Sequence, residues 1–517
     1  MASSTSLPHD DLLALPARTL RALIGRRQLS PVALMQACID RIEALNPAVN
    51  AIAATDFERA LAAARAAEAR LMRAGGETLP LLFGLPLGVK DLLETEGLLS
   101  TCGNVGLRGH VPGTDNSLVA RLKAAGAIVT AKTNVPDMGA GANTRNPVWG
   151  ATGNPFDPTR NAGGSSGGSA VALATGMLPL CTGSDTGGSL RIPAALCGVV
   201  GLRPSPGLVG NRSRTLGWSA ISVLGPMARD VADAAFMLEA CAGLDAHDPI
   251  SYATPEGSFW PLAPRDAATL RVGYTEDFGF AAVEPEIRRV FRHRVEALGR
   301  LVAVCEPVGL PMAEADRAFD VIRAESFVAA FAETYAQAPE TLGPNVRDNM
   351  ALAGAITLAE RAEAQLAQTR IAQAFAQVFE RYDLIVAPVT PVTPFPWTTL
   401  YADTVDGQPM ANYYRWLALC YGVTLSTQPA LSLPCGRDEH GMPFGLQLIG
   451  PLRGERGLLG AALAIEQAWA GDPALARPVP DLAALAARPQ PALKSIVTHP
   501  PVLDGSLPRA PAVPTAV

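Results

Sequence analysis

The chain has 517 residues, of which 48% are hydrophobic and 17% are charged, and its net charge is −6. This length and apolar content indicate a globular chain that buries one large core or two medium ones. The charge balance excludes a broad basic surface for neutralising phosphates, so we expect no nucleic-acid partner.

Segments that direct a chain to a membrane are not evident. The start, MASSTSLPHDDLL, has neither the basic nor the apolar region of a signal peptide, and no stretch approaches the roughly 18 apolar residues of a spanning helix. We therefore expect a soluble, cytoplasmic protein without a membrane partner.

The cysteines and histidines are not arranged as metal ligands. The eight cysteines are scattered in apolar contexts without a CxxC pair, and the six histidines include no HxxxH pair. We expect reduced thiols in the core, no metal site and no cofactor.

Two helices are predicted near the start of the chain. Ser30 followed by Pro31 is typical of a helix N-terminus, and apolar residues then recur at helical spacing until Asn46 and Pro47, where we expect the helix to end. A second helix is predicted over 56–74, closed by two glycines.

From about residue 80, short apolar runs alternate with helical patterns. The runs lie at 81–89, 127–131 and 384–389, and a helical pattern lies at 117–126. Buried strands that alternate with helices favour a layered α/β fold.

We expect three segments. Residues 1–75 form an N-terminal helical segment that packs on the core, residues 76–477 form the α/β domain, and residues 478–517 form an arm or tail rich in Pro and Ala. The third segment contains nine prolines and few large apolar residues after Ile496.

The stretch AGGSSGGSA, 162–170, is either a flexible linker or a loop that holds a nucleophile. A linker should have polar flanks, whereas the apolar run SAVALATGMLPL follows at once. A phosphate-binding loop would need Gly-Lys-Ser/Thr after the glycines, and that sequence is missing. The stretch also matches GxSxG, the nucleophile elbow of α/β-hydrolases, for which His440 is the candidate base, although nothing around His440 marks it as catalytic.

Two further motifs carry more information. GSDTGGSLRIPAALCG, 183–198, contains another glycine-flanked serine, and GLPLGVKDL, 84–92, places a lysine at the end of an apolar strand. Together with KTNVPDMG, NPVWGATGNPFDP, LGPMARDVADAA and DLIVAPVTP, these motifs resemble the amidase signature family from residue 10 to about 470. The resemblance implies an α/β fold with a large mixed β-sheet core covered by helices on both faces.

The resemblance also implies a catalytic triad. Lys90 is the base, Ser165 the bridging serine and Ser189 the nucleophile, with a cis peptide bond between Gly164 and Ser165. A lysine amine is a base only when neutral, and the apolar residues before Lys90 supply the burial that favours the neutral form. A serine hydroxyl between the amine and the nucleophile can relay the proton.

The glycines around the nucleophile fit an oxyanion hole. Backbone N–H groups of Thr186, Gly187, Gly188 and Ser189 can converge on one point because glycine has no side chain. By its position in KTNVPDMG, Gly139 resembles the family's substrate-lining segment. Supporting roles are predicted for the side chains of two further residues, Asp185 and Arg191, which we expect to brace the loop.

The predicted reaction is hydrolysis of an amide through an acyl-enzyme on Ser189. Aromatic residues in 258–264, 395–401 and 412–423 favour a small-molecule substrate with an apolar aryl or alkyl group, carbamates included. The alternative is the glutamine amidase subunit of a tRNA-dependent amidotransferase, whose tyrosine-rich continuation differs from this chain at 201–226. A catalytically silent binding protein is a third hypothesis, disfavoured because all three triad residues are present. Many relatives form dimers, so the resemblance allows a homodimer.

Overall fold

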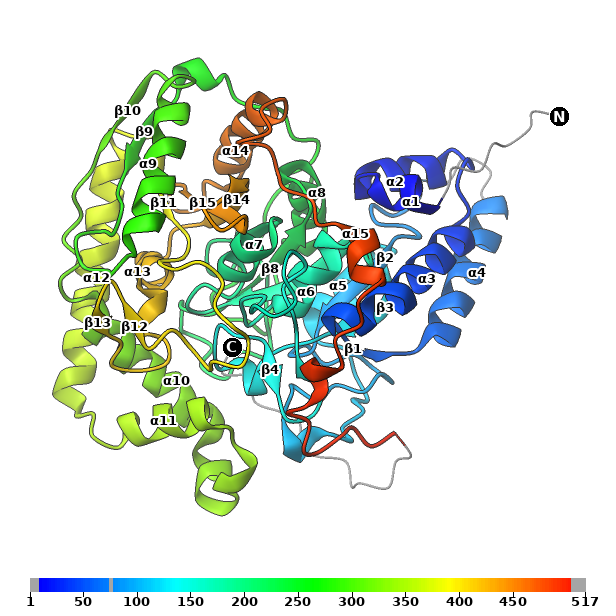
Figure 1. Ribbon diagram of the computed structural model, residues 1–517, viewed down its shortest axis with the longest axis horizontal. Coiled ribbons are helices and arrows are strands. Elements are labelled where there is room, and N and C mark those ends of the chain that lie inside the picture. Colours follow the sequence, from blue (N-terminus) through cyan, green and yellow to red (C-terminus); the bar gives the residue numbers. More distant parts are fainter. Residues whose placement is uncertain (1–8, 74–77, 504–517) are drawn as a thin grey trace.

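A mixed sheet of eleven strands forms the centre of the computed structural model, which describes residues 9–73 and 78–503 (Figure 1). Its strand order is β1-β3-β2-β6-β8-β7-β14-β15-β11-β9-β10. The strands are β1 (Ile52–Thr55), β2 (Pro86–Lys90), β3 (Ile128–Thr133), β6 (Leu180–Asp185), β7 (Val200–Arg203), β8 (Val223–Ala228), β9 (Arg271–Tyr274), β10 (Val304–Pro307), β11 (Leu384–Pro388), β14 (Ala430–Arg437) and β15 (Pro443–Ile449). Two small ribbons pair β4 (Arg145–Asn146) with β5 (Gly150–Ala151) and β12 (Thr404–Val405) with β13 (Gln408–Pro409).

Helices cover both faces of this sheet, as the sequence predicted. On one face α6 and α7 pack together and against the central strands, and on the other α8 packs with α14. The helices are α1 (His9–Ala14), α2 (Ala17–Gly25), α3 (Pro31–Val49), α4 (Phe57–Arg73), α5 (Ser117–Ala124), α6 (Gly167–Ala174), α7 (Arg191–Cys197), α8 (Val231–Cys241), α9 (Pro285–Gly299), α10 (Ala315–Gln337), α11 (Pro344–Ala353), α12 (Leu358–Phe379), α13 (Ala418–Ser426), α14 (Glu455–Trp469) and α15 (Leu482–Ala486). Within the described residues, no helix is both long and apolar enough to cross a membrane.

The strand pairing places the chemical motifs at one edge. Strands β2 and β6 are parallel neighbours, with Leu87 opposite Leu180 and Gly88 opposite Cys181. Their carboxyl ends therefore meet, and these ends carry Lys90 and the loop that leads to Ser189. The predicted strand runs and the helix pattern at 117–126 are confirmed by β2, β3, β11 and α5.

The first predicted helix begins where expected but ends later. The Ser30 hydroxyl accepts hydrogen bonds from the N–H groups of Val32 and Ala33, which confirms the N-cap. The prediction that Asn46 and Pro47 end the helix is wrong, since α3 continues to Val49. A proline in the last turn removes only one N–H donor, and Asn50 then ends the helix in a left-handed conformation.

The described parts of the N-terminal and C-terminal segments contact the core. The N-terminal segment supplies the edge strand β1 as well as helices, which its sequence pattern did not indicate. The second helix is present as α4, and the glycines expected to close it lie outside the described residues. In the C-terminal segment, Leu485 and Leu493 are buried, and the N–H of Gln490 donates to the Pro47 carbonyl. The described residues of this segment therefore include several that pack on the core, and its assignment as an arm or tail stays a prediction.

Candidate active site

Lys90 is fully buried at the end of β2 and is held by three hydroxyl groups. Its backbone N–H donates to Thr182 Oγ1 over 2.9 Å, and its Nζ donates to Ser165 Oγ over 2.7 Å and to Ser184 Oγ over 2.8 Å. Burial lowers the pKa of the amine to about 7, although the nearby Asp185 carboxylate opposes this shift. The neighbouring Asp91 pairs with Lys132 and Thr101 instead of Lys90.

The glycine-rich stretch at 162–170 is an ordered, buried loop that leads into α6, and so it is not a linker. The peptide bond between Gly164 and Ser165 is cis. Thr144 stabilises the loop, because its hydroxyl donates to the Gly163 carbonyl and accepts from the Gly167 N–H. A Cβ on Gly164 would lie 3.0 Å from the carbonyl carbon of Ala142, so the backbone of this loop packs directly on the segment after Gly139.

Ser189 lies in the turn between β6 and α7. Between residues 161 and 200, all of which the structure describes, Ser189 is the only residue that is not buried. Its hydroxyl forms no hydrogen bond with a described residue. The glycine-rich loop contacts both flanks of this turn. A Cβ built on Gly163, in the loop, would lie 2.8 Å from Pro193 Cα, and a Cβ built on Gly183, before the turn, would lie 3.1 Å from Ser166 Oγ. The turn that carries Ser189 therefore packs against the loop that carries Ser165.

Asp185 and Arg191 fix the shape of this turn. The Asp185 carboxylate accepts hydrogen bonds from the backbone N–H groups of Gly188 and Leu190 and from two nitrogens of Arg191. Arg203 also donates to its carboxylate and its carbonyl. Burial alone would raise the pKa of Asp185, but Arg191 and Arg203 hold it well below its usual range. The carboxylate thus stays charged at the centre of the turn.

The sequence predicted that backbone N–H groups of this turn bind an oxyanion. The Gly188 N–H is already bound by Asp185, which makes Gly188 a less suitable donor than the sequence suggested. The N–H groups of Thr186, Gly187 and Ser189 have no acceptor among the described residues. Gly139 lies at a positive φ of 70°, and its N–H donates to the Pro136 carbonyl, so any contribution to substrate binding would come from another of its atoms.

Three residues that contact Lys90 or Asp185 were not predicted from the sequence. Ser184 and Thr182 were not singled out in the sequence, yet both lie on the side of β6 that faces Lys90. Their spacing of two along a strand is the signal that could have indicated them. Arg203 lies on β7, beyond β8 in the sheet, so its contact with Asp185 follows only from the strand order.

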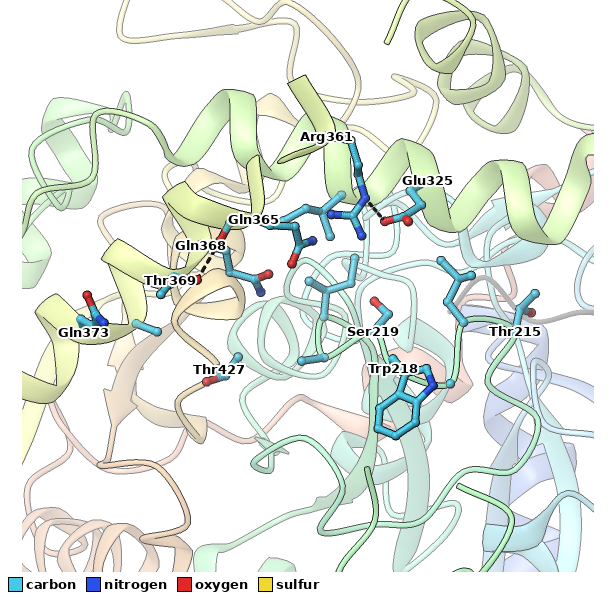
Figure 2. A pocket seen from close by; sticks show the side chains of 16 residues that line it. Thr215, Trp218, Ser219, Glu325, Arg361, Gln365, Gln368, Thr369, Gln373 and Thr427 are labelled. Carbon is cyan, nitrogen blue, oxygen red and sulfur yellow. Dashed lines mark hydrogen bonds and ion pairs between the residues drawn. The ribbon is translucent and has the colours of Figure 1, made fainter. Parts of the chain in front are cut away.

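One large cleft among the described residues is not lined by the triad. It has a volume of about 740 Å³ and lies between α10, α12 and the segment 215–221, with Trp218 at its edge and Arg361 paired to Glu325 (Figure 2). Ile221, which lines the cleft, accepts a hydrogen bond at its carbonyl from Arg203, and Arg203 in turn contacts Asp185 at the nucleophile turn. The cleft is therefore adjacent to the site, not the site itself.

Several other sequence candidates lie elsewhere. His440 is exposed in the turn between β14 and β15 and contacts Glu286, so it does not reach the glycine-rich loop. The aromatic residues of 258–264 pack on α8 through a Phe236 and Trp260 contact, and Trp397 packs against Leu493. The segment 412–423 reaches the nucleophile turn, since a Cβ on Gly188 would lie 2.7 Å from Cys420 Cβ. The Phe395 carbonyl accepts a hydrogen bond from Asn161, just before the glycine-rich loop. Within the described residues, no cluster of three or more His, Cys, Asp or Glu side chains could hold a metal.

Comparisons with known proteins agree with this geometry. A family model described as Amidase matches residues 33–459. One subunit of the glutamyl-tRNA(Gln) amidotransferase of Picosynechococcus is 36% identical over 486 residues, covering 88% of this chain and 98% of the relative. A bacterial aryl acylamidase of the amidase signature enzymes has a TM-score of 0.83 at 27% identity, covering 92% of this chain and 99% of that one. The same amidotransferase subunit from Thermotoga maritima has a TM-score of 0.69 at 25% identity, covering 93% and 99%.

One prediction from the sequence is contradicted by these relatives. We expected a small-molecule substrate and no nucleic-acid partner, whereas the curated relatives are named as subunits of an enzyme that acts on a glutamyl-tRNA. Net charge alone therefore does not exclude a function connected with a nucleic acid.

Proposed function

The chain belongs to the amidase signature family, and on this basis we propose that it hydrolyses the C–N bond of an amide with Ser189 as nucleophile. Neutral Lys90 accepts the proton of Ser165, and Ser165 in turn accepts the proton of Ser189. At the same time, Ser189 Oγ forms a bond to the carbonyl carbon of the amide. The 2.7 Å contact between Lys90 Nζ and Ser165 Oγ, in a site where burial lowers the pKa of the amine to about 7, is the observation that carries this proposal.

The rest of the cycle uses the same groups. N–H groups of Thr186, Gly187 and Ser189 stabilise the negative carbonyl oxygen of the tetrahedral intermediate. As this intermediate collapses, the C–N bond breaks, the proton returns through Ser165 to the leaving nitrogen, and ammonia or an amine departs. Water then attacks the acyl-enzyme, giving up one proton along the relay, and the carboxylic acid is released from Ser189.

For the substrate, we propose the side-chain amide of glutamine, with the ammonia used by partner subunits on a tRNA. The curated relatives, which are 36% identical over nearly their full length, support this choice over an apolar amide. A second candidate is a free-standing hydrolase of aryl or alkyl amides, carbamates included. The higher TM-score of the aryl acylamidase, 0.83 against 0.69 for the Thermotoga protein, supports it.

Both candidates are tested by incubating the purified chain with glutamine and, separately, with a simple anilide, and by measuring the release of ammonia and of aniline. Ammonia release from glutamine, with little aniline release, is the expected result. Rapid anilide hydrolysis without glutamine turnover would replace the first candidate by the second. Turnover of neither substrate by a sample whose Ser189 reacts with a fluorophosphonate would contradict both substrate assignments and leave the nucleophile assignment standing.

A further inference from the structure

A buried arginine close to the nucleophile turn has no carboxylate partner. Arg323, on α10, is only 6% exposed, and aromatic rings surround its guanidinium, with centroids 4.6 Å (Phe327), 5.2 Å (Tyr414) and 5.6 Å (Tyr413) from Cζ. No carboxylate among the described residues lies within ion-pair distance of it. Asp320, one turn earlier, is instead bound to Arg415 and Tyr414. A buried charge without a counter-ion is costly, so a ligand is the natural source of one.

Hydrogen bonding around Arg323 leaves several donors unused. Its Nη2 donates to Tyr413 Oη over 2.6 Å, and Asn349 Nδ2 donates to the same oxygen over 2.6 Å. Because this oxygen already accepts twice, the Tyr413 hydroxyl proton must point elsewhere, and no described residue accepts it. Arg323 Nε is buried without an acceptor, and Nη1 also lacks one but is not fully buried. Arg323 Nε, Arg323 Nη1 and the Tyr413 hydroxyl are therefore three donor groups without an acceptor among the described residues.

Two acceptors next to these donors are also unused. The Oδ1 atoms of Asn345 and Asn349, both on α11, are buried without a donor. Their Nδ2 atoms are bound, since Asn345 donates to the Ala140 carbonyl over 2.7 Å and Asn349 donates to the Asn345 carbonyl and to Tyr413. The cluster thus offers unused donors for an anion and unused acceptors for an N–H group.

This cluster lies between two walls of the active site. On one side Phe319, one turn from Arg323, contacts the nucleophile turn, since a Cβ on Gly187 would lie 3.2 Å from Phe319 Cζ. On the other side Asn345 binds Ala140, and the adjoining Gly141 carbonyl would lie 3.1 Å from a Cβ on Gly164. A ligand held here would extend from Arg323 toward Ser189.

We propose that the acyl part of the substrate carries a carboxylate, which Arg323 and Tyr413 bind at the end of the site away from Ser189. Charge-assisted hydrogen bonds from a guanidinium suit a carboxylate, and the Asn345 and Asn349 oxygens accept from an N–H group on the same ligand. This inference rests on the proposed amide hydrolysis. It selects amides that bear a carboxylate, of which glutamine is one, over neutral aryl or alkyl amides.

Binding without turnover tests the inference. Glutaramate and pentanamide have the same number of carbons and the same amide, and only glutaramate has a carboxylate. We measure their binding to the Ser189→Ala variant by calorimetry. Glutaramate should bind at least about 10-fold more tightly, and Arg323→Met or Tyr413→Phe, added to Ser189→Ala, should weaken glutaramate binding by roughly 10- to 100-fold without a similar effect on pentanamide. Arg317→Gln, an exposed site on the same helix, is the matched control and should change neither.

Equal binding of the two amides, no binding of glutaramate, or equal loss of both in the Arg323→Met variant would overturn the inference. Tyr413→Phe keeps the aromatic ring, so it remains informative if Arg323→Met does not fold. Glutamine compared with glutaramate tests the two asparagine oxygens, with tighter glutamine binding expected. Failure of the proposed hydrolysis would be seen separately, as absence of fluorophosphonate labelling on Ser189 of the unmodified protein.

Discussion

Lys90 Nζ lies 2.7 Å from Ser165 Oγ, with both residues completely buried. A second hydroxyl, on Ser184, lies 2.8 Å from the same nitrogen. A neutral amine has two N–H donors and one lone pair, so it can donate to Ser184 and accept the Ser165 proton. In the neutral amine, donation to Ser184 leaves the lone pair for the Ser165 proton, whereas the charged amine donates to both hydroxyls.

The first prediction concerns pH. Burial lowers the pKa of Lys90 to about 7, so the base is neutral above that pH and protonated below it. The rate of Ser189 acylation by a fluorophosphonate should rise through a midpoint near 7 and then level off. A midpoint near the usual 10.5 of lysine would contradict the assignment. Lys90→Met should leave a slow rate without this pH dependence.

The same shift affects stability. Between about pH 7 and 10.5, the unfolded state holds a proton on Lys90 that the folded state lacks. The free energy of unfolding should therefore increase as the pH rises through this window, and this increase should be smaller in Lys90→Met. Urea unfolding at several pH values measures the difference. If the free energy of unfolding depended on pH identically in the two proteins, the pKa of Lys90 in the folded state would not be lowered.

The relay serine gives a third prediction. Ser165→Ala removes the hydroxyl that connects Lys90 to the nucleophile and should slow amide hydrolysis by about 100- to 10,000-fold. Ser495→Ala, an exposed serine of the C-terminal arm, is the control and should hydrolyse amides at the normal rate. Steady-state kinetics with a shared substrate compares them, and a drop of less than a few fold in Ser165→Ala would remove Ser165 from the mechanism.

Asp185 should be essential for stability. It is fully buried between Arg191 and Arg203, so Asp185→Asn leaves two buried guanidinium groups without a counter-ion. We expect a loss of about 3–5 kcal/mol in the free energy of unfolding, measured by urea denaturation. Glu439→Gln breaks an exposed ion pair with Arg289 and should leave the midpoint unchanged. Equal small effects in both variants would contradict this role for Asp185.

The nucleophile turn tolerates no side chain at Gly188. Its φ is 123°, and a Cβ there would lie 2.6 Å from Ile192 Cδ1 and 2.7 Å from Cys420 Cβ. Gly188→Ala should displace the turn and reduce acylation of Ser189 by about 100-fold or more, on the order of the loss of one oxyanion donor. Gly441→Ala changes a glycine with a positive φ of 76° and open space around it, and it should leave acylation unaffected.

The sequence predicted the parts of the site that reside in contiguous motifs. The layered fold predicted from these patterns is confirmed. Lys90, Ser165 and Ser189 each lie in a short pattern of glycines and apolar residues, and their catalytic roles stay predictions. Contacts that depend on the strand order could not be predicted. The contact between Arg203 and Asp185 is an example, because it requires knowing that β7 lies two strands from β6.

The substrate end of the site was predicted least well. Arg323 and Tyr413 are 90 residues apart, and in the sequence each belongs to an ordinary amphipathic or aromatic stretch. Aromatic composition alone suggested an apolar pocket. In the structure, the rings of Tyr413 and Tyr414 lie around the buried guanidinium of Arg323. Under the proposal above, this charge binds a carboxylate in place of the apolar group expected from the sequence.

The central claim is that Ser189 is the nucleophile and that Lys90 activates it. Peptide mass spectrometry after incubation with a fluorophosphonate tests it most directly, with Lys90→Ala compared with the unmodified chain. The account predicts a single adduct on Ser189 that forms far more slowly without Lys90. An adduct on Ser166, or no adduct on a well-folded sample, would contradict it.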